Sequence, residues 1–390
     1  MIYELEASQY GKVHSLFQGL WYHLAIFSVL EGNSPGQVLA NDVDDPRTAF
    51  VWDQIEGGFY LGGDAGDRAF NRALNAWILE EIYPEAREIP RLLDFTLNYE
   101  PEIWMSELDV ILEGTRPLKH QRKHFALERL KIADWRTRIP KGFDLVRVDG
   151  TFLARTGMEN MENVCRWVMN SWQSIENFEE RGVGFCLVHG DTIASWCIGD
   201  YVADGGKAYE IGIHTDEDYR RRGLATLTVA AAADHCLSRG VEHVGWHCWS
   251  SNLASAATAR KVGFVQTVEH PVYHAWYNRF DNLLVQANFC FQWEQYEETA
   301  MYCERAFAMQ EQEAADFFDS SIYPDLPEGW LRYRAASVWA LLGENDVAFE
   351  HLRQALDDGW RDWASAAADD AFASLRQTPE WRALIDGMEK

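Results

Sequence analysis

The chain has 390 residues, of which 61 are Asp or Glu and 35 are Lys or Arg, so its formal net charge is −26. A charge of this sign disfavours nucleic acid and anionic membrane surfaces as main partners, and it suits a cationic substrate such as an amine. Hydrophobic residues make up 47% of the chain, which indicates packed domains and excludes general disorder.

The seven cysteines have no C-x-x-C spacing, so they indicate neither a disulfide framework nor a zinc site, and we predict no metal. The N-terminus lacks a basic signal-peptide region, and the apolar stretch over residues 16–30 is interrupted by Gln18, Gly19, His23 and Ser28. That stretch is too short and too polar to span a bilayer. We therefore expect a soluble, cytoplasmic protein.

Residues 1–135 read as a mixed α/β region. The periodicity predicts a helix over 8–30, strands over 36–39, 49–55 and 59–62, and a helix over 70–83. The loop over 62–67 contains no arginine, and its two aspartates, Asp64 and Asp67, would repel a phosphate group. The polar, proline-containing segment 134–141 marks the predicted boundary to the next domain.

Residues 136–280 read as a second α/β region. Strands are predicted over 143–148, 184–188, 192–200, 208–215, 244–249, 265–269 and 272–277. Helices are predicted over 161–172, over 226–237 with a stop at Arg239-Gly240, and from Asn252 onward.

Residues 281–390 read as all helical, with helix pairs over 283–293 and 297–308 and over 331–342 and 346–356. The segments around Ala306 and Ala355 resemble second helices of tetratricopeptide (TPR) repeats, but their offset, 355 − 306 = 49 residues, exceeds the usual period of about 34. The acidic segment 311–328 would be the insertion, and residues 369–381 resemble a terminal repeat cap. We expect a stabilising or dimerising helical cap. A peptide-docking groove is the alternative, and a homodimer is left open.

The most informative motif lies between the strand over 208–215 and the helix that follows it, and it reads Arg220-Arg221-Arg222-Gly223-Leu224-Ala225. At a strand–turn–helix junction, free backbone N–H groups and the helix dipole converge on an anion. Gly223 allows close approach of the backbone, Ala225 adds little bulk, and the arginines add charged donors. The motif therefore predicts a pyrophosphate site.

The spacing Arg220-x-x-Gly223-x-Ala225 resembles the acetyl-CoA motif of the GNAT acetyltransferases. The order downstream is also similar: a strand with Trp246-His247-Cys248, a helix opened by Asn252-x-x-Ser255, and a closing Gly263-Phe264 pair. The strings Gly184-Phe185-Cys186 and Ser195-Trp196-Cys197 resemble the zwittermicin A resistance branch of that family, and we extend this likeness over residues 36–278.

The resemblance implies an α/β (α+β) GNAT fold with a mixed, splayed central sheet. It would comprise a GNAT-like N-terminal domain without a cofactor site (1–135), a catalytic GNAT domain (136–280) and a TPR-like helical domain (281–390). The implied cofactor is acetyl-CoA. By resemblance, backbone groups of Ile211 and Ile213 would hold its pantetheine arm, with a contact from Asn252, itself a plausible helix N-cap. The pyrophosphate would lie against the loop residues Arg220, Arg221, Arg222, Gly223, Leu224, Ala225 and Thr226.

Glu210 is the candidate general base, because its strand would carry a side chain to the acyl group and a carboxylate can accept a proton from an ammonium. His214 and His247 are alternative bases. Many GNAT enzymes carry a tyrosine, as acid to the thiolate, at the position of Ala259 in this chain. Ser255 could hydrogen-bond the sulfur instead, Tyr273 is a remote second choice, and a thiolate can also leave without an acid.

These residues predict an acetyl-CoA-dependent N-acetyltransferase acting on a primary amine of a small molecule, with an amino-containing antibiotic as one candidate. One alternative is a protein N-acetyltransferase in which the helical domain docks a polypeptide. Another is a non-catalytic acyl-CoA-binding sensor, to which the Ala259 departure points.

Overall fold

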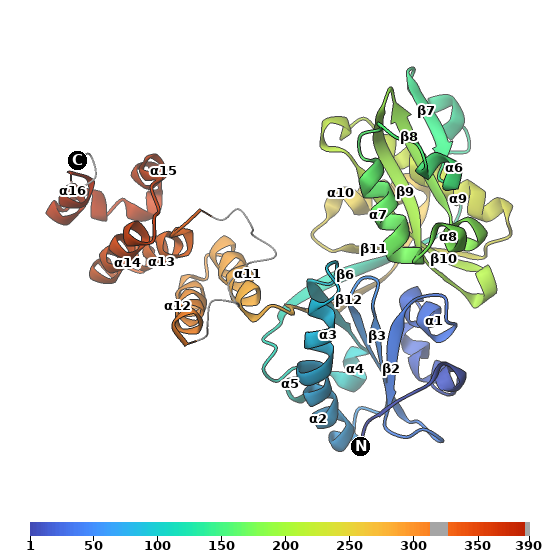
Figure 1. The fold of residues 1–390 in the computed structure, drawn as a ribbon, viewed down its shortest axis with the longest axis horizontal. Coiled ribbons are helices and arrows are strands. Elements are labelled where there is room, and N and C mark those ends of the chain that lie inside the picture. Colours follow the sequence, from blue (N-terminus) through green and yellow to red (C-terminus); the bar gives the residue numbers. More distant parts are fainter. Residues whose placement is uncertain (313–326, 387–390) are drawn as a thin grey trace. The chain divides into compact units, whose positions relative to one another are not determined.

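A computed structural model of the chain describes residues 1–312 and 327–386 (Figure 1). The chain forms two compact units, Met1–His274 and Ala275–Lys390, and each is described by itself. In the part of the chain that the structure describes, no helix has both the length and the apolar character needed to cross a membrane.

The first unit is built on one sheet that takes in twelve strands of the described residues. In spatial order these are β1 (Tyr3–Glu4), β2 (Gly36–Ala40), β3 (Thr48–Asp53), β4 (Gly58–Gly63), β5 (Asp94–Asn98), β12 (Phe264–Trp276), β6 (Leu118–Leu127), β11 (His243–Trp249), β10 (Ala208–Thr215), β9 (Thr192–Ala203), β8 (Gly184–His189) and β7 (Phe143–Arg147). The mixed sheet and the following helical region agree with the predicted fold class.

The strand order repeats in two halves, which we call the first half (residues 1–135) and the second half (136–274). Each half contains one parallel pair, β4 with β5 and β10 with β11, and each pair is in register over three residues only. Two strands are exchanged between the halves. β6 pairs with β11 of the second half, and β12 lies beside β5 of the first. The sheet is therefore continuous across the predicted boundary near residue 135.

The N-terminal segment differs from the single helix predicted over residues 8–30. It forms 3₁₀ segments at Ala7–Lys12 and His14–Leu20, and then a short helix, α1 (Leu24–Leu30). Gly11 and Gly19 weaken a continuous helix, and the backbone at His23, with φ −95° and ψ 87°, is not helical. The prediction of one long helix was wrong because the glycines outweigh the apolar periodicity.

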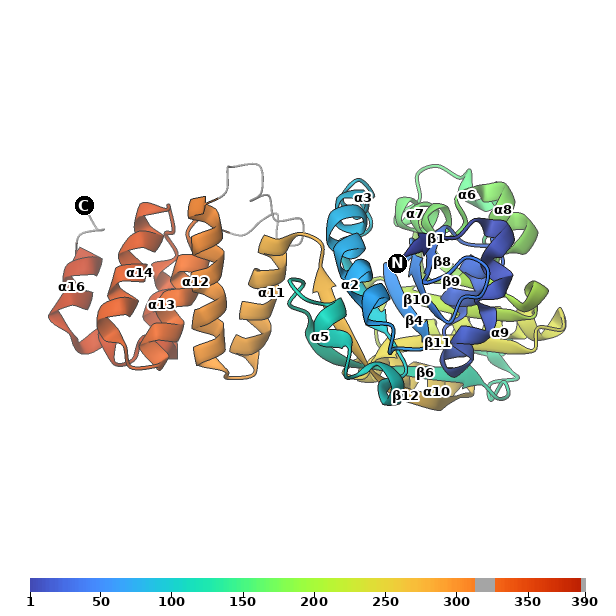
Figure 2. The ribbon, with the colours of Figure 1, turned by 90° about the horizontal axis from the view of Figure 1, so that it is seen from below.

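Helices α2 (Arg68–Trp77) and α3 (Tyr83–Arg87), joined by a π turn at Ile78–Ile82, continue the helix predicted over 70–83. Figures 1 and 2 show them on one side of the first-half strands and α1 on the other. The short helices α4 (Pro101–Trp104) and α5 (Leu108–Ile111) complete this half. The strands predicted near residues 36, 49 and 59 are confirmed as β2, β3 and β4.

The second half carries α6 (Gly150–Leu153), α7 (Met161–Trp172), α8 (Ile175–Arg181), α9 (Leu224–Ser238) and α10 (Leu253–Val262). Helix α7 packs on one face of the sheet and α9 on the other (Figures 1 and 2). The apolar residues between these layers form a continuous core. The helix predicted over 161–172 and the strand predicted over 208–215 are confirmed with the same bounds.

The strands predicted over 265–269 and 272–277 are one strand, β12. Its register with β6 continues through Pro271, opposite Gln121, and shifts only at a bulge between Gln266 and Val268. A proline removes one donor but tolerates extended backbone, so the break predicted there was wrong.

The second unit contains α11 (Arg279–Gln292), α12 (Tyr296–Gln312), α13 (Trp330–Leu341), α14 (Asn345–Asp357), α15 (Trp363–Ala368) and α16 (Pro379–Asp386). From α11 to α14, each helix packs against the next one in the chain. The two predicted helix pairs are therefore confirmed. The predicted boundary between 280 and 281 falls inside α11, and most of the predicted insertion over 311–328 lies outside the described residues.

Candidate active site

The sheet opens between two parallel strands in the second half. β10 pairs with β11 only over Ala208 to Glu210, where Glu210 lies opposite Gly245. Beyond that point β11 stays paired with β6, and β10 stays paired with β9. The strands therefore diverge, and the β11-facing edge of residues 211–215 can accept an extended ligand in the manner of an added strand. Ile211 and Ile213, the predicted pantetheine contacts, lie on this edge.

The turn before α9 leaves its backbone donors open. Gly223 has φ +78° and is the N-cap residue of α9, and no side chain caps this helix end. A Cβ added at Gly223 would meet no protein atom within 4 Å. The amides of the first turn, at Leu224, Ala225 and Thr226, therefore have no side-chain cap, and the positive end of the helix dipole lies behind them. This is the environment that a phosphate requires.

The three arginines of the turn are exposed and play different parts. Arg220 forms an ion pair with Glu217 (2.8 Å), and Arg222 donates to the carbonyl of Asp218 (2.8 Å). Arg221 has φ +61°, a left-handed backbone that costs a non-glycine residue about 1–2 kcal/mol. Backbone strain of this kind concentrates at functional sites. Among the described residues Arg221 has no ion-pair partner, so its guanidinium is free to meet an anion.

The corresponding turn of the first half is closed. Asp67 caps α2 by accepting a hydrogen bond from the amide of Phe70 (2.9 Å), and Asp64 accepts from the amide of Gly66 (2.8 Å). These carboxylates occupy backbone donors and bring negative charge to the helix start. The contrast with Gly223 supports the prediction that the first half has no cofactor site.

Glu210 lies where the strands diverge, and it pairs with a histidine. Its Oε1 accepts a hydrogen bond from Nδ1 of His247 on β11, at 2.6 Å. Both side chains are largely buried, with exposed fractions of 11% and 6%. Burial raises the pKa of Glu210 to about 7, and the nearby Arg122 guanidinium opposes this rise. In the described part of the chain, Oε2 of Glu210 has no protein donor, so it is free to meet a substrate.

Two further buried histidines, His23 and His270, lie beside His247. The rings of His23 and His247 stack at 4.8 Å between centroids, and the ring of His270 lies 4.9 Å from that of His23. Burial lowers the pKa of all three, to about 3 for His270, because a charged imidazolium loses its hydration there. The three rings are therefore neutral at physiological pH. His247 was predicted only as an alternative base, and the other two were not singled out.

An acidic, aromatic cavity of about 400 Å³ lies on the α7 side of β10. Asp200, at a bulge in β9, accepts hydrogen bonds from Nε1 of Trp167 (2.5 Å) and from the hydroxyl of Ser171 (3.2 Å). Burial, followed by the charge of Glu56, raises the pKa of Asp200 well above its usual value. Glu56 lines the same cavity from the first half, and burial raises the pKa of its carboxyl group. Arg166 also lines the cavity but forms an ion pair with Glu162 (2.6 Å), so the two carboxyl groups are those left to meet a cation.

His214 lines this cavity, stacked on Trp196 with 4.5 Å between ring centroids. His214 and Glu210 are both at even positions of β10, so their side chains lie on the same face of the sheet, as the alternation along a strand predicts. Asp200, Trp167 and Glu56 were not predicted as site residues, because they come together from β9, α7 and the loop after β3. One signal was present: Asp200 is the one charged residue of the strand predicted over 192–200.

The residues at the start of α10 lie close to β11. Asn252 is the N-cap, and its side chain accepts from the amide of Ser255 (3.0 Å), as predicted. The hydroxyl of Ser255 accepts from Nε1 of Trp246 (3.0 Å) and also hydrogen-bonds the thiol of Cys248. Ala259 is fully buried in the core. Tyr273 packs beside Tyr99 of the first half, with 6.0 Å between ring centroids.

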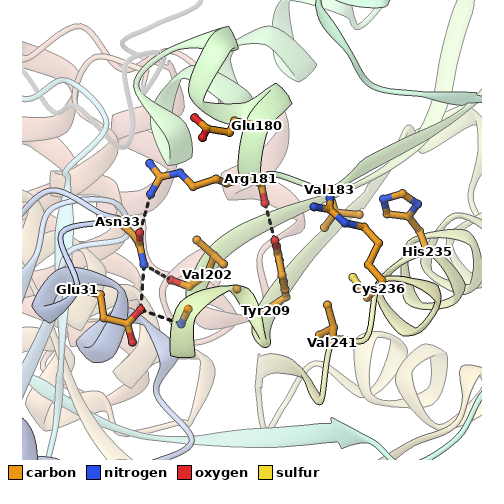
Figure 3. A pocket seen from close by; sticks show the side chains of 13 residues that line it. Glu31, Asn33, Glu180, Arg181, Val183, Val202, Tyr209, His235, Cys236 and Val241 are labelled. Carbon is orange, nitrogen blue, oxygen red and sulfur yellow. Dashed lines mark hydrogen bonds between the residues drawn. The ribbon is translucent and has the colours of Figure 1, made fainter.

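A second cavity of about 400 Å³ lies near the opposite end of α9 (Figure 3). Part of its polar lining is paired: Arg181 donates to Asn33 (2.6 Å), and the hydroxyl of Tyr209 donates to the carbonyl of Arg181 (2.6 Å). His235 and Cys236, in the last turn of α9, also line it. A 15-residue helix is about 22 Å long, so this cavity is separate from the Gly223 turn.

The sequence model of the GNAT acetyltransferases matches residues 14–273 of this chain. The chain therefore belongs to the GNAT acetyltransferase family, and it is an acetyltransferase. Enzymes of this family generally use acetyl-CoA. The match ends one residue before the first unit ends.

A curated relative is described as "Uncharacterized N-acetyltransferase YdfB" of Bacillus subtilis (strain 168). It is 26% identical over 275 residues, which cover 70% of this chain and 99% of the relative. A solved GCN5-related N-acetyltransferase-like protein from Streptococcus suis 89/1591 is similar in fold, with a TM-score of 0.54 at 20% identity. That similarity covers 69% of this chain and 99% of the other.

Proposed function

We propose that the chain transfers an acetyl group from acetyl-CoA to a primary amine of a small molecule. The observation that carries this proposal is the opening between β10 and β11, which lies between the uncapped Gly223 turn and an acidic cavity. Acetyl-CoA, when bound, supplies an acyl group activated as a thioester.

The chain's donors fit that cofactor. The first-turn amides of α9 and the guanidinium of Arg221 suit a pyrophosphate, and nothing fills the space beside Gly223. The free edge of β10 at Ile211 and Ile213 suits an amide-containing arm, because each backbone group there can pair with a ligand amide. Asn252, exposed at the start of α10, is placed in the same group by resemblance.

The amine follows from the charge and shape of the cavity beside β10. Asp200 and Glu56 attract an ammonium, while Trp167 and Trp196 offer aromatic faces of the kind that bind cations. In this proposal Glu210 takes a proton from the ammonium through its free Oε2, and His247 holds the carboxylate in place. The hydroxyl of Ser255, which contacts Trp246 and Cys248, is the proposed donor to a leaving thiolate.

The branch of the family and the type and role of the second unit are also proposals. We place the second half within the zwittermicin A resistance type and describe the second unit as TPR-like. We assign that unit a stabilising or dimerising role. The packing of each helix from α11 to α14 against the next supports the repeat-like description. An amino-containing antibiotic is accordingly one substrate to test.

The test is release of free thiol from acetyl-CoA in the presence of candidate acceptors, followed with a thiol-reactive dye. The panel contains polyamines, aminosugars, amino-containing antibiotics and short peptides with a free N-terminus, with neutral alcohols of matched size as controls. We expect turnover with small amines, and mass spectrometry should show one added acetyl group per product.

Each other outcome selects a different reading. Turnover with peptides and none with small amines would replace the proposal with a protein N-acetyltransferase. Binding of acetyl-CoA in a calorimeter without thiol release from any acceptor would favour an acyl-CoA-binding role.

A further inference from the structure

Three histidines from distant parts of the chain bring one ring nitrogen each to a common point. They are His23 before α1, His247 on β11 and His270 on β12, and their nitrogens lie within 4.8 Å of one another. His23 and His270 are buried, with exposed fractions of 4% and 3%. We call these three residues the histidine trio.

Each ring of the trio has a nitrogen without a protein partner among the residues that the structure describes. Nε2 of His23, Nε2 of His247 and both ring nitrogens of His270 are buried without a hydrogen bond. A buried polar atom without a partner costs about 1–3 kcal/mol. Three residues that share this cost at one point indicate a missing ligand that accepts several lone pairs at once.

The one paired ring nitrogen strengthens this reading. Nδ1 of His247 donates to Glu210 at 2.6 Å, so Nε2 carries the lone pair and faces the other two rings. In metal sites, a ligating histidine almost always donates its second ring nitrogen to a carboxylate or carbonyl, which fixes the tautomer. Glu210 therefore orients His247 as a metal ligand would be oriented.

We propose that His23, His247 and His270 bind a divalent transition metal ion, with Zn²⁺ fitting best. Three neutral imidazoles without a thiolate match zinc sites that have three protein ligands and a fourth position for water. At Zn–N distances of about 2.0–2.1 Å the nitrogens would stand about 3.4 Å apart. The separation of up to 4.8 Å therefore has to close by about 1.4 Å when the ion binds.

Two nearby charges act on such an ion in opposite senses: the carboxylate of Glu210 attracts it, and the guanidinium of Arg122 repels it. The guanidinium of Arg122 lies close enough to lower the pKa of all three rings. The guanidinium of Arg122 also lies near Glu210, because its charge lowers the pKa of that carboxyl group. The ion would tie the N-terminal segment to two strands of the sheet, beside the opening where β10 and β11 diverge. It leaves Oε2 of Glu210 free, but it shares His247 with the acetyl-transfer site proposed above.

The test is metal binding by the untagged full chain, freed of metal with a chelator and then dialysed against Zn²⁺. Elemental analysis should give one zinc per chain, and the melting temperature should rise with added Zn²⁺. Titration with Co²⁺ should produce the visible absorption of a four-coordinate nitrogen site. These measurements use no acetyl-CoA, so failure of acetyl transfer would leave them interpretable.

Variants connect the signal to the trio. His23→Ala and His270→Ala should each weaken zinc binding by about 100-fold or more, since even the loss of an outer carboxylate costs about 10–100-fold. Glu210→Gln should weaken it by about 10-fold. His14→Ala is the matched control, because His14 lies exposed in the same N-terminal segment and should leave binding unchanged.

Folding of each variant is checked by circular dichroism. His270→Asn keeps a polar group in place should His270→Ala unfold, and it too should lose zinc. Either of two results overturns the proposal: no zinc retained by the wild-type chain at micromolar concentration, or equal retention by the folded His23 and His270 variants.

Discussion

Gly223 and Gly240 stand just outside the two ends of α9 with almost the same backbone, φ +78° and +77°. At neither position would an added Cβ meet a protein atom within 4 Å. Substitution by alanine should therefore cost a similar amount of stability at both, about 1 kcal/mol, since both backbones are left-handed.

Only Gly223 faces the proposed pyrophosphate. We expect Gly223→Ala to weaken acetyl-CoA binding by at least about 10-fold, because a methyl group projects into the space that the phosphates need and holds them off the amides. Gly240→Ala should bind acetyl-CoA like the wild type. Isothermal titration calorimetry measures the affinity of both variants for acetyl-CoA. Equal affinity in the two variants would show that acetyl-CoA does not bind at this turn.

Glu210→Gln tests the proposed base. The change keeps size and polarity but cannot take up a proton, so kcat should fall by about 10²–10⁴ while the dissociation constant of acetyl-CoA stays the same. Asp94→Asn is the control, because Asp94 also accepts a hydrogen bond from a histidine, His274, at 2.8 Å, but lies in the first half on β5. A rate loss of the same size in both variants would assign Glu210 a structural role.

Asp200→Asn tests the amine site. Burial raises the pKa of Asp200, because it disfavours the ionised carboxylate. A bound ammonium favours the ionised form, so the KM for the amine should fall as pH rises through the pKa of Asp200. Asp200→Asn should raise this KM by about 10-fold and flatten its pH dependence. Asp144→Asn, an exposed strand aspartate, should change neither.

Asp53 predicts a pH dependence of stability. Burial raises its pKa to about 7 from 3.8, although Tyr201 donates to it at 2.5 Å. The folded state therefore holds this proton more tightly than the unfolded state, so folding stability is lost as pH rises from about 4 to about 7. Relative to Asp53→Asn, the wild-type free energy of unfolding should fall by up to about 4 kcal/mol over that window.

Denaturant unfolding at a series of pH values measures this difference. Tyr201→Phe removes a hydrogen bond that favours the ionised carboxylate, so it should shift the decline to higher pH. A wild-type-to-variant difference that does not vary with pH would show that Asp53 stays ionised in the fold.

The sequence predicted the elements around the Gly223 turn well, because their signals are local. The helix over 161–172 and the strand over 208–215 carry regular apolar patterns, and Arg239-Gly240 marks a helix end. The N-terminal segment was predicted wrongly, since apolar spacing suggested a helix that Gly11 and Gly19 interrupt. No strand was assigned to residues 118–127, where Lys, His, Gln and Arg conceal a central strand, β6.

The candidate site shows the same division. Gly223, Glu210 and Asn252 belong to motifs that are contiguous in sequence, so the pattern found them. The cavity around Asp200 and the histidine trio depend on contacts between residues more than a hundred positions apart. Nothing local distinguishes His23 or His270 from an ordinary core histidine. Only the folded sheet brings them to one point.

The exchange of β6 and β12 constrains how the chain is made. On the ribosome the first half emerges with β5 lacking the neighbour that β12 later provides, and it keeps that exposed edge until residue 276 has been synthesised. In the nascent first half, the edge of β5 therefore stays unpaired and can pair with other chains until β12 is made. β12 begins 166 residues after β5 ends (264 − 98). Neither half is a complete folding module when it is made or excised alone. A truncated product of either half exposes an unpaired strand edge that can pair with other chains.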